Sequence, residues 1–316
     1  MPRTSGPQQA WVVTGPTSGI GRRAALELAR HGTVVLVGRD PARLRDVERE
    51  IGALPGGRAM SVVADFSDIR SARRAAEEIA GLGMLIAGVA NNAGGMQTTG
   101  GASAQGWDLA FATNHLGPFA FTETLLPHLA DGTGILFTVS GVEDPDRKPA
   151  TSAGFRGARY ISAEASARGE WREGGSAHPG YDAYATSKQG NLATVLSLSR
   201  EVTRLRFIAV EPGFTPGTGL GRDATPALRF IARHVLQPLA PLIPYWSTPQ
   251  RAGRLIAAIL TAPSVPSGTY YDENGKPLRA STQVSDPEFS DRYITETRAL
   301  LAGVPSAAAS DPDAVA

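Results

Sequence analysis

Short apolar runs alternate with longer amphipathic segments along most of this chain. Seven runs of β-branched, leucine or aromatic residues are bounded by turn or capping residues, which is typical of strands. They are Trp11–Thr14, Val34–Val37, Met60–Val63, Leu85–Ala90, Ile135–Val139, Phe207–Val210 and Gly268–Tyr271. Strands that alternate with helices form parallel sheets covered on both faces. The pattern therefore predicts an α/β fold, a doubly wound parallel sheet of about seven strands with helices on both faces.

The amphipathic segments between these runs predict helices. Asp40 before Pro41 marks an N-cap and a first helical residue, and Asp68 and the pair Thr248-Pro249 mark two further helix starts. The predicted helices are Ile20–Arg30, Ala42–Ile51, Ile69–Ala80, Ala104–Leu116 with a continuation through Leu129, Tyr181–Thr203 and Gln250–Leu260.

Two stretches interrupt this alternation. Residues 143–180 are rich in Gly, Ala, Ser and charged residues, and they form a long irregular insertion. Residues 304–316 consist mainly of Ala, Ser, Asp and Pro, which predicts a disordered tail. No internal repeat is present, so we expect residues 1–316 to form a single domain.

Composition excludes several classes of function. The chain has 31 basic and 30 acidic residues, so no strong field favours nucleic acid, and no apolar stretch is long and unbroken enough to span a membrane. Without cysteine, disulfides, thiolate metal sites and cysteine nucleophiles are excluded, which fits the cytoplasmic location we expect. The five histidines form no short metal-binding pair, so no metal is expected.

A glycine-rich turn lies between the first predicted strand and the first predicted helix, in the sequence Thr14-Gly15-Pro16-Thr17-Ser18-Gly19-Ile20-Gly21. Glycines allow the backbone to approach a pyrophosphate, whose charge is stabilised by the amides and the dipole at a helix N-terminus. Such glycines also occur in turns without a ligand, but the strand–turn–helix context favours a dinucleotide site.

The end of the second predicted strand, Gly38-Arg39-Asp40, lies where dinucleotide folds bind the adenine ribose. The Arg39 guanidinium suits a 2′-phosphate, so the sequence favours NADP(H). Asp40 precedes Pro41 and is expected to cap a helix. Arg22 and Arg23 either add charge near that phosphate or lie on a solvated helix face.

Tyr184 and Lys188 lie four residues apart in a predicted helix and therefore share a face. A free tyrosine has a pKa of about 10, which is too high for acid–base catalysis. A neighbouring ammonium and an oxidised nicotinamide would both lower the pKa of Tyr184 toward neutrality. A Tyr-x-x-x-Lys pattern alone is common, and most such pairs lie on protein surfaces.

Several motifs, in this order, resemble the short-chain dehydrogenase/reductase family. They are the glycine turn, Asn91-Asn92-Ala93-Gly94 after the fourth predicted strand, Asn114, Ser140 closing the fifth, Tyr184-Ala185-Thr186-Ser187-Lys188, and Pro212-Gly213 after the sixth. The resemblance covers residues 10–303. Ser247-Thr248-Pro249 and Gly268-Thr269-Tyr270-Tyr271 are similar to the branch with retinol dehydrogenases and protochlorophyllide reductase.

The resemblance implies a Rossmann-like fold and a role for each matching residue. Tyr184 would exchange a proton with the substrate oxygen, and Ser140 would hydrogen-bond to that oxygen. Lys188 would hold the nicotinamide ribose, and Asn114 would anchor a water linked to Lys188. The implied NADP(H) contacts are Gly15, Thr17, Ser18, Gly19, Ile20, Gly21, Arg39, Asp65, Phe66, Asn91, Ala93, Gly94, Tyr184, Lys188, Pro212, Gly213 and Thr215.

Some of these residues also have a purely structural interpretation. The Asn91–Gly94 segment could be a turn that stabilises the sheet, Ser140 a strand-end hydroxyl, and Asn114 a residue at a helix kink. The complete set, with Tyr184 and Lys188, favours the catalytic interpretation.

Two segments depart from the usual pattern of the family. Ser140 and Tyr184 are 44 positions apart, so the 143–180 insertion is expected near the active site. Its Phe155, Tyr160 and Trp171 either contact substrate or belong to a surface loop. Residues 214–247 correspond to the substrate lid of the family, and their apolar content indicates a bulky apolar substrate. The insertion leaves open whether the homo-oligomer usual in the family forms.

The predicted function is NADP(H)-dependent reduction of a carbonyl, or oxidation of the matching secondary alcohol, on a bulky apolar small molecule. One alternative keeps the cofactor but reduces a carbon–carbon double bond, or performs a redox-neutral epimerisation, cyclisation or dehydration with Glu211 or the insertion as an extra acid. Another is a dinucleotide sensor without turnover. Ser140, Tyr184, Lys188 and Asn114 together argue against the sensor, because a pure binder needs no acid–base tyrosine.

Overall fold

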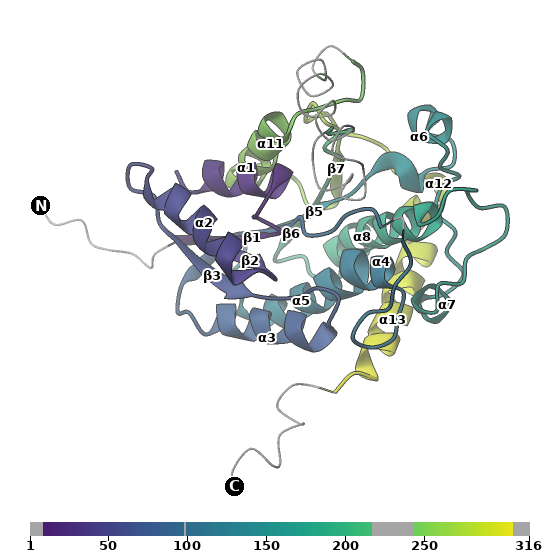
Figure 1. The fold of residues 1–316 in the computed structure, drawn as a ribbon, viewed down its shortest axis with the longest axis horizontal. Helices are drawn as coiled ribbons and strands as arrows, with labels where there is room; N and C mark the ends of the chain where they lie inside the picture. Colours follow the sequence, from purple (N-terminus) through teal and green to yellow (C-terminus); the bar gives the residue numbers. More distant parts are fainter. Residues whose placement is uncertain (1–8, 98, 217–239, 241–242, 306–316) are drawn as a thin grey trace, which may run out of the picture.

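The structure, a computed structural model, describes residues 9–97, 99–216, 240 and 243–305 (Figure 1). Seven parallel strands form one sheet in the order β3-β2-β1-β4-β5-β6-β7. The strands are β1 (Gln9–Thr14), β2 (Thr33–Gly38), β3 (Ala59–Val63), β4 (Leu85–Asn91), β5 (Gly134–Thr138), β6 (Arg206–Val210) and β7 (Thr269–Tyr271). All seven predicted strands and the predicted fold class are confirmed.

Helices cover both faces of this sheet. One face packs against α1 (Gly19–Leu28), α2 (Pro41–Gly52) and α11 (Pro249–Thr261). The other packs against α3 (Ile69–Ala80), α5 (Gly117–Leu125) and α8 (Tyr181–Glu201). Because both faces are covered, every residue of β2 and of β5 is buried, which explains their unbroken apolar sequence.

The predicted helix starts depend on local capping. The Asp40 carboxylate accepts hydrogen bonds from the amides of Ala42 and Arg43, and Thr248 accepts one from Arg251. Asp68 caps α3 in the same way. These caps confirm the predicted starts, since short polar side chains satisfy amides that have no partner inside the helix.

The prediction that a helix begins at Ala104 is wrong. Ser103 and Trp107 close a turn through the hydrogen bond from Ser103 N to Trp107 O, and Asp108 then caps α4 (Leu109–Phe111) by accepting from Phe111 N. A π-helical turn, η1 (Ala112–Leu116), joins α4 to α5, and η2 (Leu126–His128) follows. The N-cap at Asp108 therefore determines where the helix begins.

The carboxyl-terminal helices were not predicted. α12 (Thr282–Ser285) and α13 (Pro287–Ala302) follow β7, and Asp286 caps α13 by accepting from Glu288 N. The Asp286-Pro287 pair repeats the signal of Asp40-Pro41, so the sequence contained the information. α13 packs along α8, where the buried Tyr293 donates from its hydroxyl to Thr186 O at 3.0 Å.

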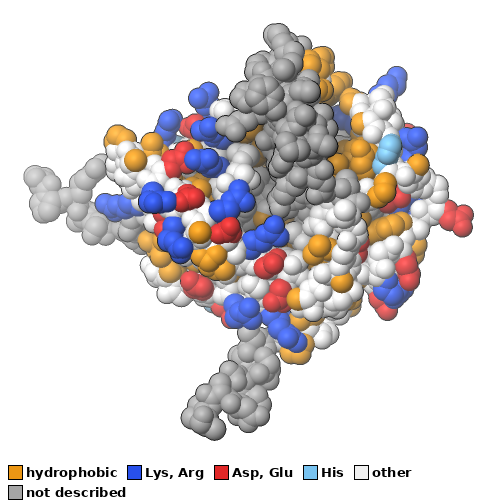
Figure 2. Space-filling view, in the orientation of Figure 1, with side chains coloured by type: hydrophobic (Ala, Val, Ile, Leu, Met, Phe, Trp, Pro, Cys, Tyr) orange, Lys and Arg blue, Asp and Glu red, His pale blue; other side chains and the backbone are white. Residues whose placement is uncertain are grey.

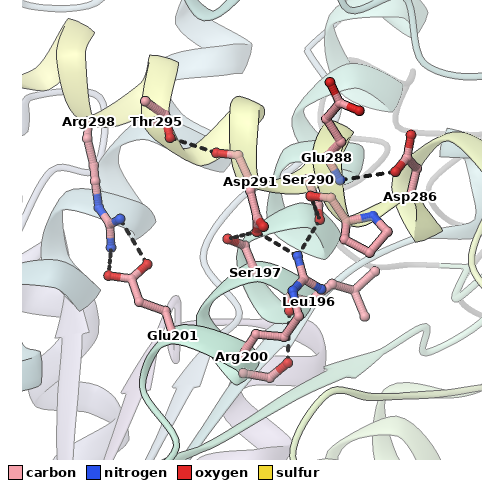
Figure 3. Close-up of polar contacts among 12 residues, drawn as sticks. Leu196, Ser197, Arg200, Glu201, Asp286, Glu288, Ser290, Asp291, Thr295 and Arg298 are labelled. Carbon is pink, nitrogen blue, oxygen red and sulfur yellow. Dashed lines mark hydrogen bonds and ion pairs between the residues drawn. The ribbon is translucent and has the colours of Figure 1, made fainter.

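Polar contacts add to this packing between α8 and α13 (Figure 3). Arg298 reaches both Glu201 of α8 and Glu123 of α5, at 2.8 and 2.9 Å. Asp291 accepts hydrogen bonds from Ser197 and Arg200, each at 2.6 Å. The helix that contains Tyr184 and Lys188 is therefore held against the sheet by a second helix from the end of the chain.

The insertion is mostly irregular, with η3 (Gly141–Glu143) at its start and two short helices, α6 (Lys148–Ser152) and α7 (Ala163–Ala167). Tyr160 stacks on Tyr293 with ring centroids 3.8 Å apart, and its hydroxyl donates to Glu296. Tyr160 therefore belongs to the core beneath α13, and the expectation that it contacts substrate is wrong.

Two predicted segments lie largely outside the described residues. The predicted lid, 214–247, is described only at 214–216, 240 and 243–247, and the predicted tail, 304–316, only at 304 and 305. Among the helices of the described residues, none has the length and apolarity that a membrane span requires.

Candidate active site

The site lies at the carboxyl edge of the sheet, where β1 and β4 are neighbours. The chain leaves β1 toward β2 and leaves β4 toward β5, so the connections diverge to opposite sides at this point. Such a switch point opens a crevice for a ligand in doubly wound sheets. The glycine turn follows β1, and Asn91-Asn92-Ala93-Gly94 lies at the end of β4.

The glycine turn has a geometry that other residues do not fit. Gly15 and Gly19 have φ of 68° and 55°, in the left-handed region. A Cβ on Gly15 would lie 2.9 Å from Ala93 Cα, and one on Gly21 would lie 2.3 Å from Gly15 O. The glycines thus leave the backbone at the N-terminus of α1 without covering side chains. Ser18 is exposed as the N-cap, and Thr17 beside it is partly exposed.

Thr14 joins the glycine turn to the loop after β4. Its Oγ1 accepts hydrogen bonds from Asn92 N and Ala93 N, both at 2.9 Å, and Asn92 Nδ2 donates to Thr14 O. Both residues belong to the motifs identified in the sequence, but neither is among the individual cofactor contacts that the resemblance implies. The available signal was a threonine at the end of a buried strand, directly before a glycine turn.

Several predicted cofactor contacts have their side chains in the core. Asn91 donates to Thr122 of α5 and is 3% exposed, Phe66 packs edge-on against Phe121, and Ile20 lies on the buried face of α1. These three residues can serve a dinucleotide only through their main chain. Asp65 differs, because it is partly exposed and accepts hydrogen bonds from the Ser67 amide and hydroxyl.

At the expected ribose position, Arg39 is exposed and has no hydrogen-bond or ion-pair partner within the described part of the chain. Asp40 is engaged in capping α2. Arg22 pairs with Glu50 of α2 at 2.6 Å, so its charge is already compensated. Of these side chains, only Arg39 presents a free guanidinium.

Tyr184, Lys188 and Ser140 are brought together at the ends of α8 and β5. The Ser140 side chain lies near the Tyr184 hydroxyl and favours a lower pKa for this phenol, and Tyr184 is 7% exposed. Lys188 Nζ donates to Thr138 O at 2.8 Å and lies 5.6 Å from the centroid of the Tyr184 ring. The predicted proximity of phenol and ammonium is thus present.

The pKa of Tyr184 does not move as expected. Burial raises this pKa and outweighs the opposing influence of the nearby Ser140, while the negative charge of Glu211 raises it further. Burial also lowers the pKa of Lys188 to about 8. Among the groups of the chain, burial therefore affects the pKa of Tyr184 more than the Lys188 ammonium does, and Tyr184 is protonated at neutral pH.

Asn114 lies in the π-helical turn, where such turns are frequent at functional sites. Its side chain accepts from Gly95 N and donates to Gly95 O, each at 2.9 Å. Its main-chain oxygen accepts from Asn191 of α8 at 2.9 Å. Asn114 therefore clamps the loop after β4 to α8, and the predicted water linked to Lys188 stays a prediction.

An apolar wall, defined as Met96, Val142, Phe155 and Tyr181, stands beside Tyr184. Phe155 of the insertion stacks on Tyr181 with centroids 4.1 Å apart and lies 6.3 Å from the Tyr184 ring. Sequence reasoning identified only Phe155 of these four, because the others become neighbours through the fold.

A pocket of about 350 Å³ is lined by residues next to this wall in the sequence, such as Gln97 after Met96 and Gly180 before Tyr181, but neither Tyr184 nor a wall residue lines it. It lies between the loop after Met96 and the segment that leads into α8, and Trp171, Asp108 and His178 are among its lining residues. Trp171 also packs against Phe111, so this residue of the insertion faces both the core and the pocket.

Large apolar side chains are also exposed near the end of β6. Phe214, Tyr245 and Ile243 are 53%, 47% and 37% exposed, and the Phe214 and Trp246 rings pack edge-on. In Figure 2 hydrophobic side chains gather near the top of the view, whereas basic and acidic side chains intermingle over α1, α2 and α3.

The turn after β6 reaches the same edge of the sheet. Gly213 has a φ of 73°, and a Cβ there would lie 2.8 Å from Tyr245 O. Thr215 is buried and donates to Gly213 O, while Pro212 is buried beside it. Glu211 is bound by Arg147 and Tyr270 and lies against the main chain of Gly141, so its carboxylate is already engaged.

No three His, Asp or Glu side chains of the described residues cluster in a way that could bind a metal ion. His115 is completely buried between Asn191 and Thr297, and burial lowers its pKa to about 4. It is therefore a neutral core residue.

Comparisons with known proteins agree with this geometry. The profile of the family described as short chain dehydrogenase matches residues 9–151. A protein of Streptomyces sp. (strain C5) assigned as the daunorubicin C-13 ketoreductase DnrU is 32% identical over 225 residues, which cover 71% of each chain. This chain belongs to the short-chain dehydrogenase/reductase family.

Other members of the short-chain dehydrogenase/reductase family match over more of the chain. Protochlorophyllide reductase of Chlamydomonas reinhardtii is 26% identical over 314 residues, 92% of this chain and 76% of its own, which confirms the branch that the motifs indicate. The crystal structure of a short-chain dehydrogenase from Burkholderia cenocepacia J2315 with NADP has 22% identity and a TM-score of 0.60, and the match covers 85% of this chain and 97% of that one. It confirms the fold.

The short-chain dehydrogenase/reductase family consists of oxidoreductases that bind a nicotinamide dinucleotide. The residues present fit such a group. The bare glycine backbone, which a Cβ would fill, lies at the N-terminus of α1, and Arg39 presents an uncompensated cation at the end of β2. Both features suit an anionic dinucleotide.

Proposed function

We propose that this protein is an NADP(H)-dependent oxidoreductase that reduces a carbonyl of a bulky apolar small molecule, or oxidises the matching secondary alcohol. The main support is the arrangement of Tyr184, whose buried side chain lies near Ser140 and whose ring lies 5.6 Å from Lys188 Nζ. This group stands at the carboxyl edge of the sheet, on the same side as the glycine turn.

The chemistry divides between the cofactor and the chain. When bound, the nicotinamide supplies or accepts the hydride. In reduction, the Tyr184 hydroxyl donates its proton to the substrate oxygen, and the Ser140 hydroxyl donates a hydrogen bond to the same oxygen, which stabilises the negative charge that develops there. The raised pKa of Tyr184 keeps this proton in place at neutral pH.

Lys188 and Asn114 support that step. Lys188 is fixed by the Thr138 carbonyl, and its remaining N–H groups can hold a ribose hydroxyl. Asn114 holds the Gly94–Gly95 loop, which limits the space beside the reacting atoms. The cofactor would contact the turn at Gly15 and Gly19 and the exposed Ser18.

The preference for NADP(H) rests on Arg39. Its guanidinium is exposed and unpaired among the described residues, and the carboxylate that could otherwise bind a 2′-hydroxyl, Asp40, is engaged as an N-cap. Arg39→Ala should weaken NADPH binding by at least about tenfold and leave NADH binding nearly unchanged. Equal losses for both cofactors, measured by fluorescence titration, would contradict the assignment.

The substrate class follows from the surroundings of Tyr184. The apolar wall and the pocket beside it suit a bulky apolar molecule, part of which extends toward Trp171. We propose that residues 143–180 and 214–247 form the substrate side of a single domain. The relative assigned as a ketoreductase supports a carbonyl as the reacting group.

Reduction of a carbon–carbon double bond is the second candidate, and the match to protochlorophyllide reductases over 92% of the chain favours it. The same Tyr184 would then donate its proton to carbon. A redox-neutral reaction with Glu211 as an extra acid has less support, because Arg147 and Tyr270 already bind the Glu211 carboxylate.

The test of the proposed function is Tyr184→Phe, assayed with NADPH and a panel of polycyclic aryl ketones. We expect a loss of about 10³-fold in kcat, with NADPH affinity unchanged, because only the proton donor is removed. Tyr271→Phe, which removes a phenol hydroxyl from β7, is the matched control. Retention of full ketone reduction in Tyr184→Phe would refute the proton-transfer role.

A further inference from the structure

A partly buried ion pair joins the insertion to the end of β6. Arg147 Nη2 lies 2.9 Å from Glu211 Oε2, and the side chains are 20% and 12% exposed. It is the least exposed ion pair within the described residues. Arg147 directly precedes α6 and is 64 positions from Glu211 in the sequence.

The Glu211 carboxylate also lies against the main chain next to Ser140. A Cβ on Gly141 would lie 2.8 Å from Glu211 Oε1, and Gly141 favours a lower pKa for this carboxyl group. The Tyr270 hydroxyl of β7 donates to Oε2 at 3.1 Å. Glu211 thus holds the turn that presents the Ser140 hydroxyl to Tyr184, and this turn has no room for a side chain at Gly141.

Arg147 extends the same cluster to the edge of the predicted lid. Its guanidinium lies over the Tyr245 ring, 5.3 Å from the centroid. Tyr245 has a φ of 66°, which a non-glycine residue rarely adopts, and its carbonyl accepts from Phe214 N at 2.9 Å. The guanidinium of Arg147 therefore links the insertion, to which Arg147 belongs, with the end of β6 and with Tyr245.

We infer that Arg147 and Glu211 are positioning residues that fix the Ser140–Gly141 turn and balance the charge beside Tyr184, so that the insertion controls proton transfer. This inference rests on the proposed function. Neither residue touches the Tyr184 hydroxyl. The insertion acts through the ion pair, in addition to the wall that it contributes through Phe155.

The electrostatic part of this inference follows from the groups around the two side chains. Glu211 faces Arg147, Tyr270 and Glu273, and Tyr184 faces Ser140, Lys188 and Glu211. An ionised Glu211 disfavours the phenolate of Tyr184, and Arg147 offsets that charge. Removal of the carboxylate and removal of the guanidinium should therefore shift the titration of Tyr184 in opposite directions.

The experiment measures the titration of Tyr184 directly. Protein labelled at the tyrosine ζ-carbon is titrated by NMR with NADP⁺ present, and the Tyr184 signal is identified by its loss in Tyr184→Phe. We expect Glu211→Gln to shift the midpoint down by about one pH unit and Arg147→Met to shift it up by a similar amount. Glu211→Gln combined with Arg147→Met should lie near the parent, and Arg147→Lys should restore most of the parent value.

The matched control is Arg168→Met, which removes an exposed ion pair from the same insertion and should leave the midpoint unchanged. Unchanged midpoints in both single variants, or shifts in the same direction, would overturn the inference. Because this readout needs no turnover, it is independent of the proposed function, which fails only if Tyr184→Phe keeps its activity. Should Arg147→Met not fold, Glu211→Gln alone decides.

Discussion

Residues 9–97 and the described residues from 99 to 305 both contribute to the candidate site, but contacts of different range hold the two regions together. In the first region, strands and helices alternate along the chain. The caps at Asp40 and Asp68 bind amides that are only two or three residues away. In the second region the contacts around the insertion span long separations, such as Glu143 with Ser281 and Tyr160 with Glu296.

This difference separates the generic part of the site from the specific part. The first region contains Arg39 and the glycine turn, which suit a dinucleotide; the positive φ angles of the turn depend on local sequence, although Ala93 limits the space around Gly15. The second contains Ser140, Tyr184 and, apart from Met96, the apolar wall, which depend on how the insertion and α13 pack against α8. Substitutions in the glycine turn or at Arg39 should therefore impair cofactor binding. Substitutions that disrupt the long-range contacts of the insertion should instead alter substrate selection.

The largest expected effect tests the first region. Gly15→Ala places a Cβ 2.9 Å from Ala93 Cα at a φ of 68°, so we expect NADPH affinity to fall by at least about 100-fold. Gly56 has a similar φ of 71° with open space around it, which makes Gly56→Ala the control. NADPH titration and circular dichroism distinguish lost binding from lost fold, and equal affinities in the two variants would contradict the prediction.

The second prediction concerns the pH dependence of stability in the second region. Glu143 is buried against the Ser281 amide and hydroxyl, and burial raises its pKa from 4.5 to about 7. Its stabilising contribution is thus complete below pH 4.5 and is lost as pH rises to about 7. Relative to the parent, Glu143→Gln should gain about 3 kcal/mol in the free energy of unfolding across this window.

Denaturant unfolding of both proteins at pH 5 and pH 8 measures this difference. The buried His115 has the opposite dependence, since burial lowers its pKa, but its contribution is common to both proteins and cancels. Glu173→Gln, at an exposed position of the same insertion, is the control. A variant–parent difference that stays constant between the two pH values would disprove the assignment to Glu143.

A smaller effect tests the wall beside Tyr184. Phe155→Ala removes the ring that stacks on Tyr181, and we expect kcat/KM for a polycyclic ketone to fall by about tenfold with NADPH affinity unchanged. Ile161→Ala, at a residue of the insertion that is 50% exposed, is the control. If the two variants turn over all ketones of the panel alike, Phe155 does not contact the substrate.

The smallest effect concerns the polar contacts between α8 and α13 in Figure 3. Arg298→Met removes ion pairs to Glu123 and Glu201 whose side chains are about one-third to one-half exposed, so the expected loss is only about 0.5 kcal/mol. A loss above about 2 kcal/mol in denaturant unfolding would show that ion pairs, rather than the buried Tyr293, hold α13 in place.

The sequence predicted the strands better than the helices of the second region. Continuous apolar runs such as Thr33–Gly38 are local signals, and so are the caps at Asp40 and Thr248. The start of α4 was wrong because Asp108 competes as a cap, and α13 was missed although Asp286-Pro287 has the signature used elsewhere. These errors concern the interpretation of signals that were present.

Other parts of the site had no local signal. Met96, Val142 and Tyr181 lie far apart in the sequence, and the apolar pattern of each segment suits many partners. The roles of Arg147 and Glu211 also depend on a contact across 64 positions. A sequence pattern fixes which side chains are polar, but it does not state which of them meet.

By itself, the sequence determined the parallel sheet, the glycine turn and the identity of the Tyr184–Lys188 pair, because backbone conformation and helical spacing depend on near neighbours. Only the tertiary structure decided that Asn91 and Phe66 face the core, that burial raises the pKa of Tyr184, and that the insertion reaches Ser140 through Arg147 and Glu211. Burial and long-range pairing depend on how all the elements pack, and no short stretch of the chain encodes them.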